Sequence, residues 1–293
     1  MTYSIVARDP QTGDLGIGVQ THQPSVGAIV PWVKAGVGAV ATQSYVNPKF
    51  GPQGLALLET GLDPDRTLAA LLAADTEPEV RQLAIIDATG RVAVHTGSAC
   101  IPFAGHRTGE GYSVQANMML NDTVPGAMAA AFESATGHLA SRILFALEAA
   151  QGEGGDIRGS QSAAILIRHT TSAEDFLWNL RVDNDPEPLA KLRTLVDIRL
   201  AEETLDAATT SSKDIADPVE RLRALRDAYA RANELAPSDE QTFWFAVSGL
   251  APLGQLDEAQ AILAPIFDRS PAWRELLLRL RPTDIAPLQD RYR

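Results

Sequence analysis

Short runs of β-branched and small apolar residues recur along the first part of the chain, with turn residues between them. Such runs predict strands, buried on one face where apolar and polar residues alternate and on both faces where the run is continuous. The segments 9–14 and 88–90 carry Asp, Pro, Thr and Gly, the residues of tight turns. Strands are predicted at 3–8, 15–19, 28–33, 36–42, 83–87, 91–96, 163–168 and 177–182, with a strand or extended loop at 109–117.

Helix signals lie between these strands. Residues 51–60 end before Gly61, and Asp63 or Asp65 is placed to cap a second helix that ends near Ala74. Two more helices are predicted at 124–135 and 139–151. This order of strands and helices predicts an α+β fold in which helices cover layered sheets, rather than alternating βαβ units.

The composition changes near residue 206. A helix is predicted at 189–205, the segment 207–214 is small and polar, and the chain from Pro218 onward has only helix signals. We therefore expect a domain at 1–205, a linker at 206–217 and a helical domain at 218–293. Pro237 and Pro271 lie 34 residues apart, the spacing of a tetratricopeptide-type helical repeat, and a plain helical hairpin is the alternative.

The charge balance limits the classes of binding partner that are expected. The 25 Lys and Arg residues against 37 Asp and Glu give a net charge of -12, which disfavours nucleic acid and anionic membranes. The single Cys100 excludes an internal disulfide and is expected to be a buried small apolar residue. Without a signal-peptide pattern or an apolar run of membrane-spanning length, the chain is predicted to be cytoplasmic.

Common catalytic motifs do not occur in the sequence. It has no phosphate-binding Gly-x-x-x-x-Gly-Lys-Ser/Thr loop and no Gly-x-Ser-x-Gly elbow, and its five histidines are scattered. We therefore expect metal-independent chemistry without a cofactor. The informative residue is Thr2, because removal of Met1 would place a nucleophilic hydroxyl and a basic α-amine on one residue.

Three polar clusters accompany Thr2. The glycine-rich segment 154–162 presents Asp156, Arg158 and Gln161 between a helix and a strand, where they bind a ligand or form a tight connection with an internal ion pair. The other clusters are Arg181 with Asp183, on one strand face, and Gln43 with Asn47 at a strand end, where the amides bind a ligand or cap turns.

Five ordered blocks resemble one family, a bacterial and archaeal domain of unknown function with an N-terminal-nucleophile (Ntn) hydrolase-like fold. The blocks lie within roughly the first 198 residues, at 2–9, 35–43, 95–97, 154–163 and 180–183. The resemblance implies a four-layer αββα sandwich, the fold of proteasome β-subunits and Ntn amidases. Family members with a peptidoglycan-binding module suggest a role in peptidoglycan or peptide metabolism. The chain departs from the family pattern at Asp183-Asn184-Asp185, where Asp-Asp-His is usual, and at Ala116-Asn117, where Gly-Asn is usual.

Together these features predict an amide hydrolase that acts on a small peptide-like or amino-acid-derived substrate. Thr2 is the expected nucleophile, Gln43, Asn47 or Asn117 would stabilise the oxyanion, and Asp156 would orient the amine. Substrate binding is expected from Asn47, Arg158, Gln161, Arg181 and Asp183.

Two alternatives remain open at this stage. One is a non-catalytic module that binds a small ligand, or a protein partner through the C-terminal helices. The other is hydrolysis by Ser4 or Asp9 without N-terminal processing. A homo-oligomer is compatible with each of these hypotheses.

Overall fold

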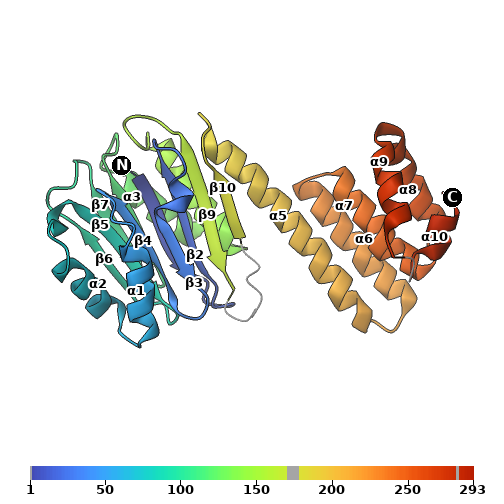
Figure 1. Ribbon diagram of the computed structural model, residues 1–293, viewed down its shortest axis with the longest axis horizontal. Coiled ribbons are helices and arrows are strands. Elements are labelled where there is room, and N and C mark those ends of the chain that lie inside the picture. Colours follow the sequence, from blue (N-terminus) through green and yellow to red (C-terminus); the bar gives the residue numbers. More distant parts are fainter. Residues whose placement is uncertain (1, 170–177, 282–283) are drawn as a thin grey trace. The chain divides into compact units, whose positions relative to one another are not determined.

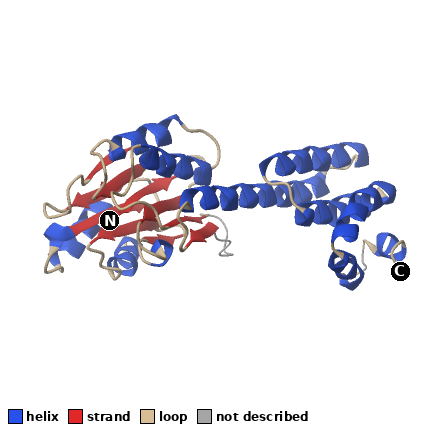
Figure 2. Ribbon diagram, turned by 90° about the horizontal axis from the view of Figure 1, so that it is seen from above, coloured by secondary structure: helices blue, strands red, loops and turns tan. Residues whose placement is uncertain are grey.

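The computed structural model describes residues 2–169, 178–281 and 284–293 and has a mixed α and β fold. The chain forms two compact units, one ending at Val196 and the other beginning at Asp197. Within the described ranges, strands lie in the first unit and the second consists of helices and loops (Figure 2). No helix in the described part of the chain is long and apolar enough to cross a membrane.

The first unit contains a six-stranded antiparallel sheet with β1 and β2 near its centre (Figure 1). The turn between these two strands is closed by Asp9, whose carboxylate accepts from the backbone N–H groups of Gln11 and Thr12. The spatial order is β10 (Trp178–Val182), β9 (Ser162–Arg168), β2 (Leu15–Thr21), β1 (Thr2–Arg8), β8 (Tyr112–Asn117) and β7 (Gly105–Gly109).

A four-stranded antiparallel sheet forms the second part of this unit. Helix α1 (Phe50–Glu59) contacts β3 and β4, and helix α2 (Pro64–Ala73) contacts β5 and β6. Asp63 caps α2 as expected, because its Oδ1 accepts from the backbone N–H of Arg66 at 2.8 Å. The strand order is β3 (Pro31–Lys34), β4 (Gly38–Ser44), β5 (Arg81–Asp87) and β6 (Val92–Thr96).

Residues from both sheets share one buried apolar cluster. Val6, Ile17 and Val19 of the six-stranded sheet belong to the same cluster as Ala41 and Ile86 of the four-stranded sheet. Burial of these side chains is the main source of stability, at about 25 cal/mol per Å² of apolar surface. Near Thr2 the buried residues between the sheets change from apolar to polar, and this change positions the site described below.

Helices α3 (Val124–Ser134) and α4 (Leu139–Gly152) cover the six-stranded sheet: α3 contacts β7 and β8, and α4 contacts β1, β2 and β9. The approach of α4 to β2 is close at Gly16 and Gly18. A Cβ atom at either position would lie 2.7 or 2.3 Å from the Ile143 side chain, so only glycine fits there.

Several predicted boundaries differ from the structure. The strand expected at 28–33 is a 3₁₀ turn, η1 (Val26–Ala28), followed by β3, because Pro31 has no N–H to extend the ladder. The segment 109–117 contains β8 and the last residue of β7, and β7 itself was not predicted. Leu177, the expected start of a strand, lies outside the described residues.

Helix α5 (Pro188–Ser211) extends into the first half of the segment 206–217 that was expected to be a linker. Small residues such as Ala207 and Ala208 continue the helix, although the polar composition there is typical of a linker. The unit boundary therefore falls inside a helix, nine residues before the predicted boundary at 205.

The second unit continues with helices around its own apolar core, which includes Phe243, Leu250 and Leu263. Pro271, one of the two prolines at the spacing of a helical repeat, begins helix α9. The helices are α6 (Pro218–Leu235), α7 (Asp239–Trp244), a π-helical segment (Phe245–Leu250), α8 (Leu256–Arg269), α9 (Pro271–Arg279) and α10 (Ala286–Asp290).

Candidate functional site

A cavity of about 520 Å³ opens at the end of the central strands of the first unit. Its volume lies within the range of small-molecule sites. Thr2, Gln43, Asn117 and Arg158, four of the residues that the sequence analysis singled out, line this cavity. Residues far apart in the sequence therefore meet at one site.

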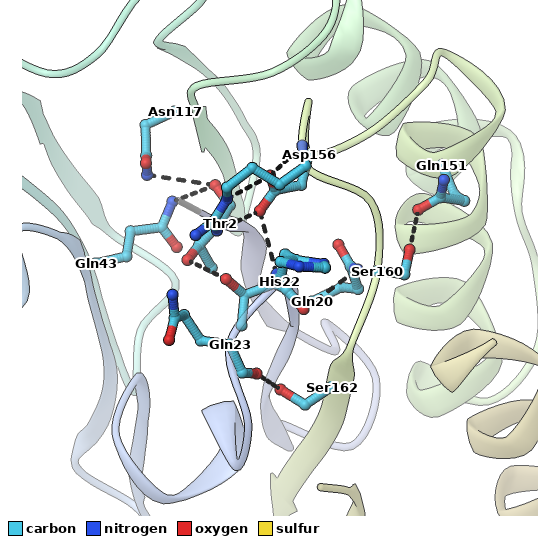
Figure 3. A network of polar contacts seen from close by, with 12 residues as sticks. Thr2, Gln20, His22, Gln23, Gln43, Asn117, Gln151, Asp156, Ser160 and Ser162 are labelled. Atoms are coloured by element: carbon cyan, nitrogen blue, oxygen red, sulfur yellow. Dashed lines mark hydrogen bonds and ion pairs between the residues drawn. The ribbon is translucent and has the colours of Figure 1, made fainter. Parts of the chain in front are cut away.

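The strand register places Thr2 at the centre of this site. Thr2 pairs with Thr21 on β2 and with Asn117 on β8, so the three side chains share one face of the sheet. Its side-chain Oγ1 donates to Thr21 Oγ1 at 3.2 Å, and the residue is only 5% exposed (Figure 3). The hydroxyl is thus fixed on the cavity wall.

Two carboxamides hold the Thr2 peptide group. Gln43 Nε2 and Asn117 Nδ2 each donate to the Thr2 carbonyl oxygen at 3.3 Å, and to Gln82 Oε1 at 2.7 and 2.8 Å. A carboxamide has two N–H donors, so these contacts occupy both donors of each group. Gln43 and Asn117 therefore position Thr2, and this geometry differs from the expected oxyanion role.

The amide orientations are set by Gln82 on β5. Its Nε2 donates to the backbone oxygens of Ala116, at 2.9 Å, and Gly105, at 3.2 Å, so its Oε1 must face Gln43 and Asn117. Asn117 Oδ1 is buried and has no hydrogen-bond partner among the described residues, which leaves one acceptor unused at the cavity.

This amide network was not predicted from the sequence. Besides Gln82, it includes Gln115, whose Nε2 donates to Ser4 Oγ at 2.6 Å, and Ser4, whose Oγ donates to Gln43 Oε1 at 2.7 Å. The available signal was a glutamine at the inward position of an otherwise apolar strand, since such a side chain requires buried partners.

Asp156 is buried beside Thr2 (Figure 3) and forms an ion pair with the partly exposed Arg158. Arg158 Nε and Nη2 donate to the Asp156 carboxylate at 3.0 and 2.8 Å, and the backbone N–H of His22 donates to it at 3.1 Å. An isolated β-bridge between Met119 and Asp156 holds this loop against the end of β8. The internal ion pair, one of the two alternatives from the sequence, is present, and Arg158 also lines the cavity.

Burial is the main cause that raises the pKa of the Tyr3 phenol well above its ordinary value, and the charge of Asp156 adds to this effect. Tyr3 donates its hydroxyl proton to Gln151 Oε1 at 3.0 Å. The neighbour of Thr2 on β1 is therefore a neutral hydrogen-bond donor at all ordinary pH values.

The other predicted binding residues do not line the cavity. Asn47 accepts from the Lys49 backbone N–H at 3.2 Å, which corresponds to the turn-capping alternative. Gln161 Nε2, just before β9, donates to Asn184 Oδ1, just after β10. Arg181, near the end of β10, pairs with Asp183 at 3.1 Å. These four predicted binding residues stabilise loops and strand ends, and the prediction that they contact substrate at this cavity is not supported by the geometry.

Strained backbone surrounds the cavity. Among the described residues, three non-glycine positions have a left-handed φ: Ser25 at 59°, Ser44 at 70° and Met118 at 55°. Ser44 lines the cavity, and the other two each adjoin a lining residue, Val26 and Asn117. Such conformations cost about 1 kcal/mol or more each and are concentrated at functional sites.

The cavity edge at Tyr45 is fixed by an ion pair. Arg81 Nη1 donates to the Tyr45 carbonyl oxygen at 2.6 Å, and Arg81 Nε donates to Asp75 Oδ2 at 2.7 Å. Cys100, which is buried as predicted, donates its thiol to the Arg81 carbonyl oxygen at 3.4 Å. The hydrogen bond from Arg81 is the largest cause that lowers the pKa of Asp75, to about 2.

Asp75→Asn is expected to lower the free energy of unfolding at pH 7 by about 1–2 kcal/mol, with allowance for solvent screening of the pair. Because the folded-state pKa lies below the ordinary value of 3.8, this contribution is complete above pH 4 and is lost as the pH falls through 2. Urea unfolding of the wild type and of Asp75→Asn at pH 7 and pH 2.5 measures this contribution to stability. Asp122→Asn, an exposed control, should match the wild type, and an equal loss at both pH values for Asp75→Asn would contradict the assignment.

Two of the histidines, His95 and His106, have structural hydrogen-bond partners. His95 Nε2 contacts the Pro78 carbonyl oxygen and His106 Nδ1 contacts Thr96 Oγ1, both at 2.9 Å. Burial, and secondarily the charge of His95, lowers the pKa of His106. Across the described ranges, no three His, Cys, Asp or Glu residues are grouped so that they could hold a metal ion.

Comparison with known proteins identifies the first unit. The family model DUF1028, described as a family of unknown function, matches residues 2–192. The chain belongs to the DUF1028 family. The crystal structure of protein SPO2555 from Silicibacter pomeroyi, which carries the same family model, is similar at a TM-score of 0.62 and 32% identity. The match covers 67% of this chain and 84% of that one.

The DUF1028 match includes every residue of the cavity and ends inside α5, so helices α6 to α10 lie outside it. Comparison with curated proteins gives no match. The activity of this DUF1028 protein therefore has to be argued from the site itself.

Proposed function

We propose that this protein is an Ntn-type hydrolase that cleaves an amide bond, with Thr2 as the nucleophile after Met1 is removed. The observation that carries the proposal is the place of Thr2: it begins the central strand β1, and its hydroxyl lies on the wall of a cavity large enough for a small substrate. A residue at this position can supply both the nucleophile and, through its α-amine, the base.

The proposed fold of the first unit is the four-layer αββα sandwich of Ntn hydrolases. Support comes from three contacts: both sheets share one buried cluster, α1 and α2 pack on the four-stranded sheet, and α3 and α4 pack on the six-stranded sheet.

In the proposed reaction Thr2 Oγ1 attacks the amide carbonyl carbon and passes its proton to the Thr2 α-amine. The amine then protonates the leaving nitrogen as the C–N bond breaks, which leaves an ester between Thr2 and the acyl group. A water molecule, deprotonated by the same amine, attacks this ester and releases a carboxylic acid. The reaction consumes one water and needs no redox partner.

The surrounding residues have separate roles in this proposal. Gln43 and Asn117 fix the Thr2 carbonyl group, so the hydroxyl and the amine keep one orientation during the reaction. The Asp156–Arg158 pair places one negative and one positive group beside Thr2, so the pair adds little net charge there.

Two measurements on the purified protein test the proposal. Intact mass spectrometry is expected to show a chain that begins at Thr2, and an electrophilic probe for N-terminal nucleophiles is expected to add once, at Thr2. A catalytically active protein that retains Met1, or a probe adduct at another residue, would exclude this mechanism. Such a result would favour the ligand-binding alternative.

For the second unit we propose a tetratricopeptide-like helical arm that binds a protein partner. Helices α6 and α7 contact each other, as do α8 and α9, and Gly254 with φ 72° makes the left-handed turn before α8. This arrangement supports two consecutive helix pairs.

A further inference from the structure

The cavity beside Thr2 has two chemically different walls. One part of the lining, called the aliphatic wall, is the segment 26–30, which contributes Val26, Ile29 and Val30. Another part carries the polar groups of Thr21, Gln23 and Arg158. An amide substrate also has two different halves, an acyl group and an amine, so the two walls indicate which half lies on which side.

The apolar surface continues outside the cavity. Ten large apolar side chains in the described ranges are exposed, and half of them are at or next to this opening. This apolar rim consists of Tyr45 (56% exposed), Val46 (37%), Phe103 (50%), Leu120 (48%) and Ile157 (56%). Exposed apolar groups gathered in one place mark a binding surface, whereas single scattered ones do not.

Backbone hydrogen bonds join the segments that carry this apolar rim. The N–H of Met119 donates to the Phe103 oxygen at 3.3 Å, and the N–H of Leu120 donates to the Gly155 oxygen at 2.9 Å. The N–H of Ile157 donates to the Met118 oxygen at 3.3 Å. The segments of Phe103, Leu120 and Ile157 are therefore held together, and Ile157 adjoins the lining residue Arg158. Tyr45 and Val46 of the apolar rim line the cavity themselves, so the apolar rim begins inside it.

The aliphatic wall is preformed. The N–H of Ser25 donates to the Asp183 oxygen at 2.9 Å and that of Val26 donates to Ser162 Oγ at 3.1 Å, so η1 is fixed to the neighbouring strands. Gly27 lies so close to β9 that a Cβ atom would be 2.7 Å from the Ala164 Cβ. A rigid apolar wall binds an apolar group without first paying an ordering cost.

We infer that the substrate is an N-acyl compound with an unbranched aliphatic acyl chain, which lies on the aliphatic wall and extends onto the apolar rim. The inference rests on the proposed function for the position of the scissile amide beside Thr2. The amine half lies toward Thr21, Gln23 and Arg158. An acyl chain is favoured over a second protein copy because the apolar rim is continuous with an interior cavity that a flat interface would leave unfilled.

Binding to a Thr2→Ala variant tests the inference without turnover. Acetyl-, butyryl-, hexanoyl- and octanoylglycine are titrated by calorimetry into this variant, after its intact mass has shown that Met1 has been removed. The affinity is expected to rise about two- to fourfold per methylene, the upper value corresponding to about 0.8 kcal/mol per buried CH₂. An analogue of hexanoylglycine with a terminal carboxylate should bind at least tenfold more weakly. Equal affinity along the series would overturn the inference.

A substitution at the apolar rim tests where the acyl chain lies. In the same background, Val46→Asp is expected to weaken octanoylglycine about tenfold and to leave acetylglycine unchanged, because only the longer chain reaches residue 46. Val219→Asp, at an apolar residue 75% exposed in α6, is the matched control and should change neither affinity. An unchanged octanoylglycine affinity in Val46→Asp, or an altered oligomeric state in sedimentation with no effect on binding, would assign the apolar rim to a protein contact and overturn the inference.

The two proposals fail in different ways. If Thr2 is not the nucleophile, Thr2→Ala retains turnover while the chain-length series still rises. If the acyl inference is wrong, the wild type hydrolyses amides through Thr2 with no dependence of kcat/KM on acyl length.

Discussion

Thr2→Ala should lower kcat by about a thousandfold or more while the protein stays folded, because the proposed nucleophile is removed and no other hydroxyl has the α-amine attached to it. Thr2 is 5% exposed and its hydroxyl contacts Thr21, so the loss of stability should be small, about 1 kcal/mol. The measurement is kcat on a panel of small N-acyl amides together with the thermal unfolding midpoint.

Three further proteins distinguish a catalytic from a structural role for Thr2. Thr2→Ser should retain part of the activity, since it keeps the hydroxyl on the same backbone. A chain extended at its N-terminus should be inactive, because an amide nitrogen at Thr2 is not basic. Thr136→Ala, in an exposed loop, controls for loss of a threonine and should be fully active. Full activity in Thr2→Ala or in the extended chain would remove the Ntn mechanism.

Gln82→Leu should lower the free energy of unfolding by about 2–4 kcal/mol, the largest stability effect expected for a single side chain near the site. Gln82 is completely buried, accepts from Gln43 and Asn117, and donates to Thr96, Ala116 and Gly105. Leucine has a similar size but leaves these partners without their hydrogen bonds in a region closed to water. Urea unfolding followed by circular dichroism measures the change.

The same substitution should also lower kcat, because Gln43 and Asn117 would no longer be held against the Thr2 carbonyl group. Gln53→Leu is the matched control: Gln53 is exposed on α1, so its replacement should change stability by no more than about 0.5 kcal/mol. A Gln82→Leu protein as stable as this control would show that the buried amide network does not stabilise the contact between the two sheets.

Most strands and helices of the first unit could be predicted from the sequence because their signals are local. Asp63 as a helix cap and the turn at Asp9 depend on residues a few positions apart, and both are present in the structure. Strand β7 was not predicted because its sequence, Gly-His-Arg-Thr-Gly, has no apolar period, and its stability comes from pairing with β8. Helix α5 extends beyond its prediction because polar composition alone does not end a helix.

The site was predictable only in part. Thr2, Gln43, Asn117 and Arg158 were identified from residue chemistry and from resemblance. Strand pairing joins Thr2 and Asn117, whereas Gln43 comes from the second sheet and Arg158 from a loop. The role of Gln82 depends on pairing between residues 43 and 82, 39 positions apart, which no sequence spacing reports. The residue types of Asn47, Gln161, Arg181 and Asp183 are equally suited to ligand binding and to turn formation. Only the folded structure distinguishes between these two roles.

Cys100 is the single thiol of the chain, and it follows that the molecule carries its own reporter of local opening. The side chain is 7% exposed, and its thiol donates a hydrogen bond to the Arg81 carbonyl oxygen. The next residue, Ile101, lines the cavity. A thiol reagent can modify Cys100 only when this segment separates from β5, so the modification rate reads the opening free energy of one wall of the site. A ligand that closes the cavity would slow the labelling in proportion to its occupancy, without any engineered label or knowledge of the reaction.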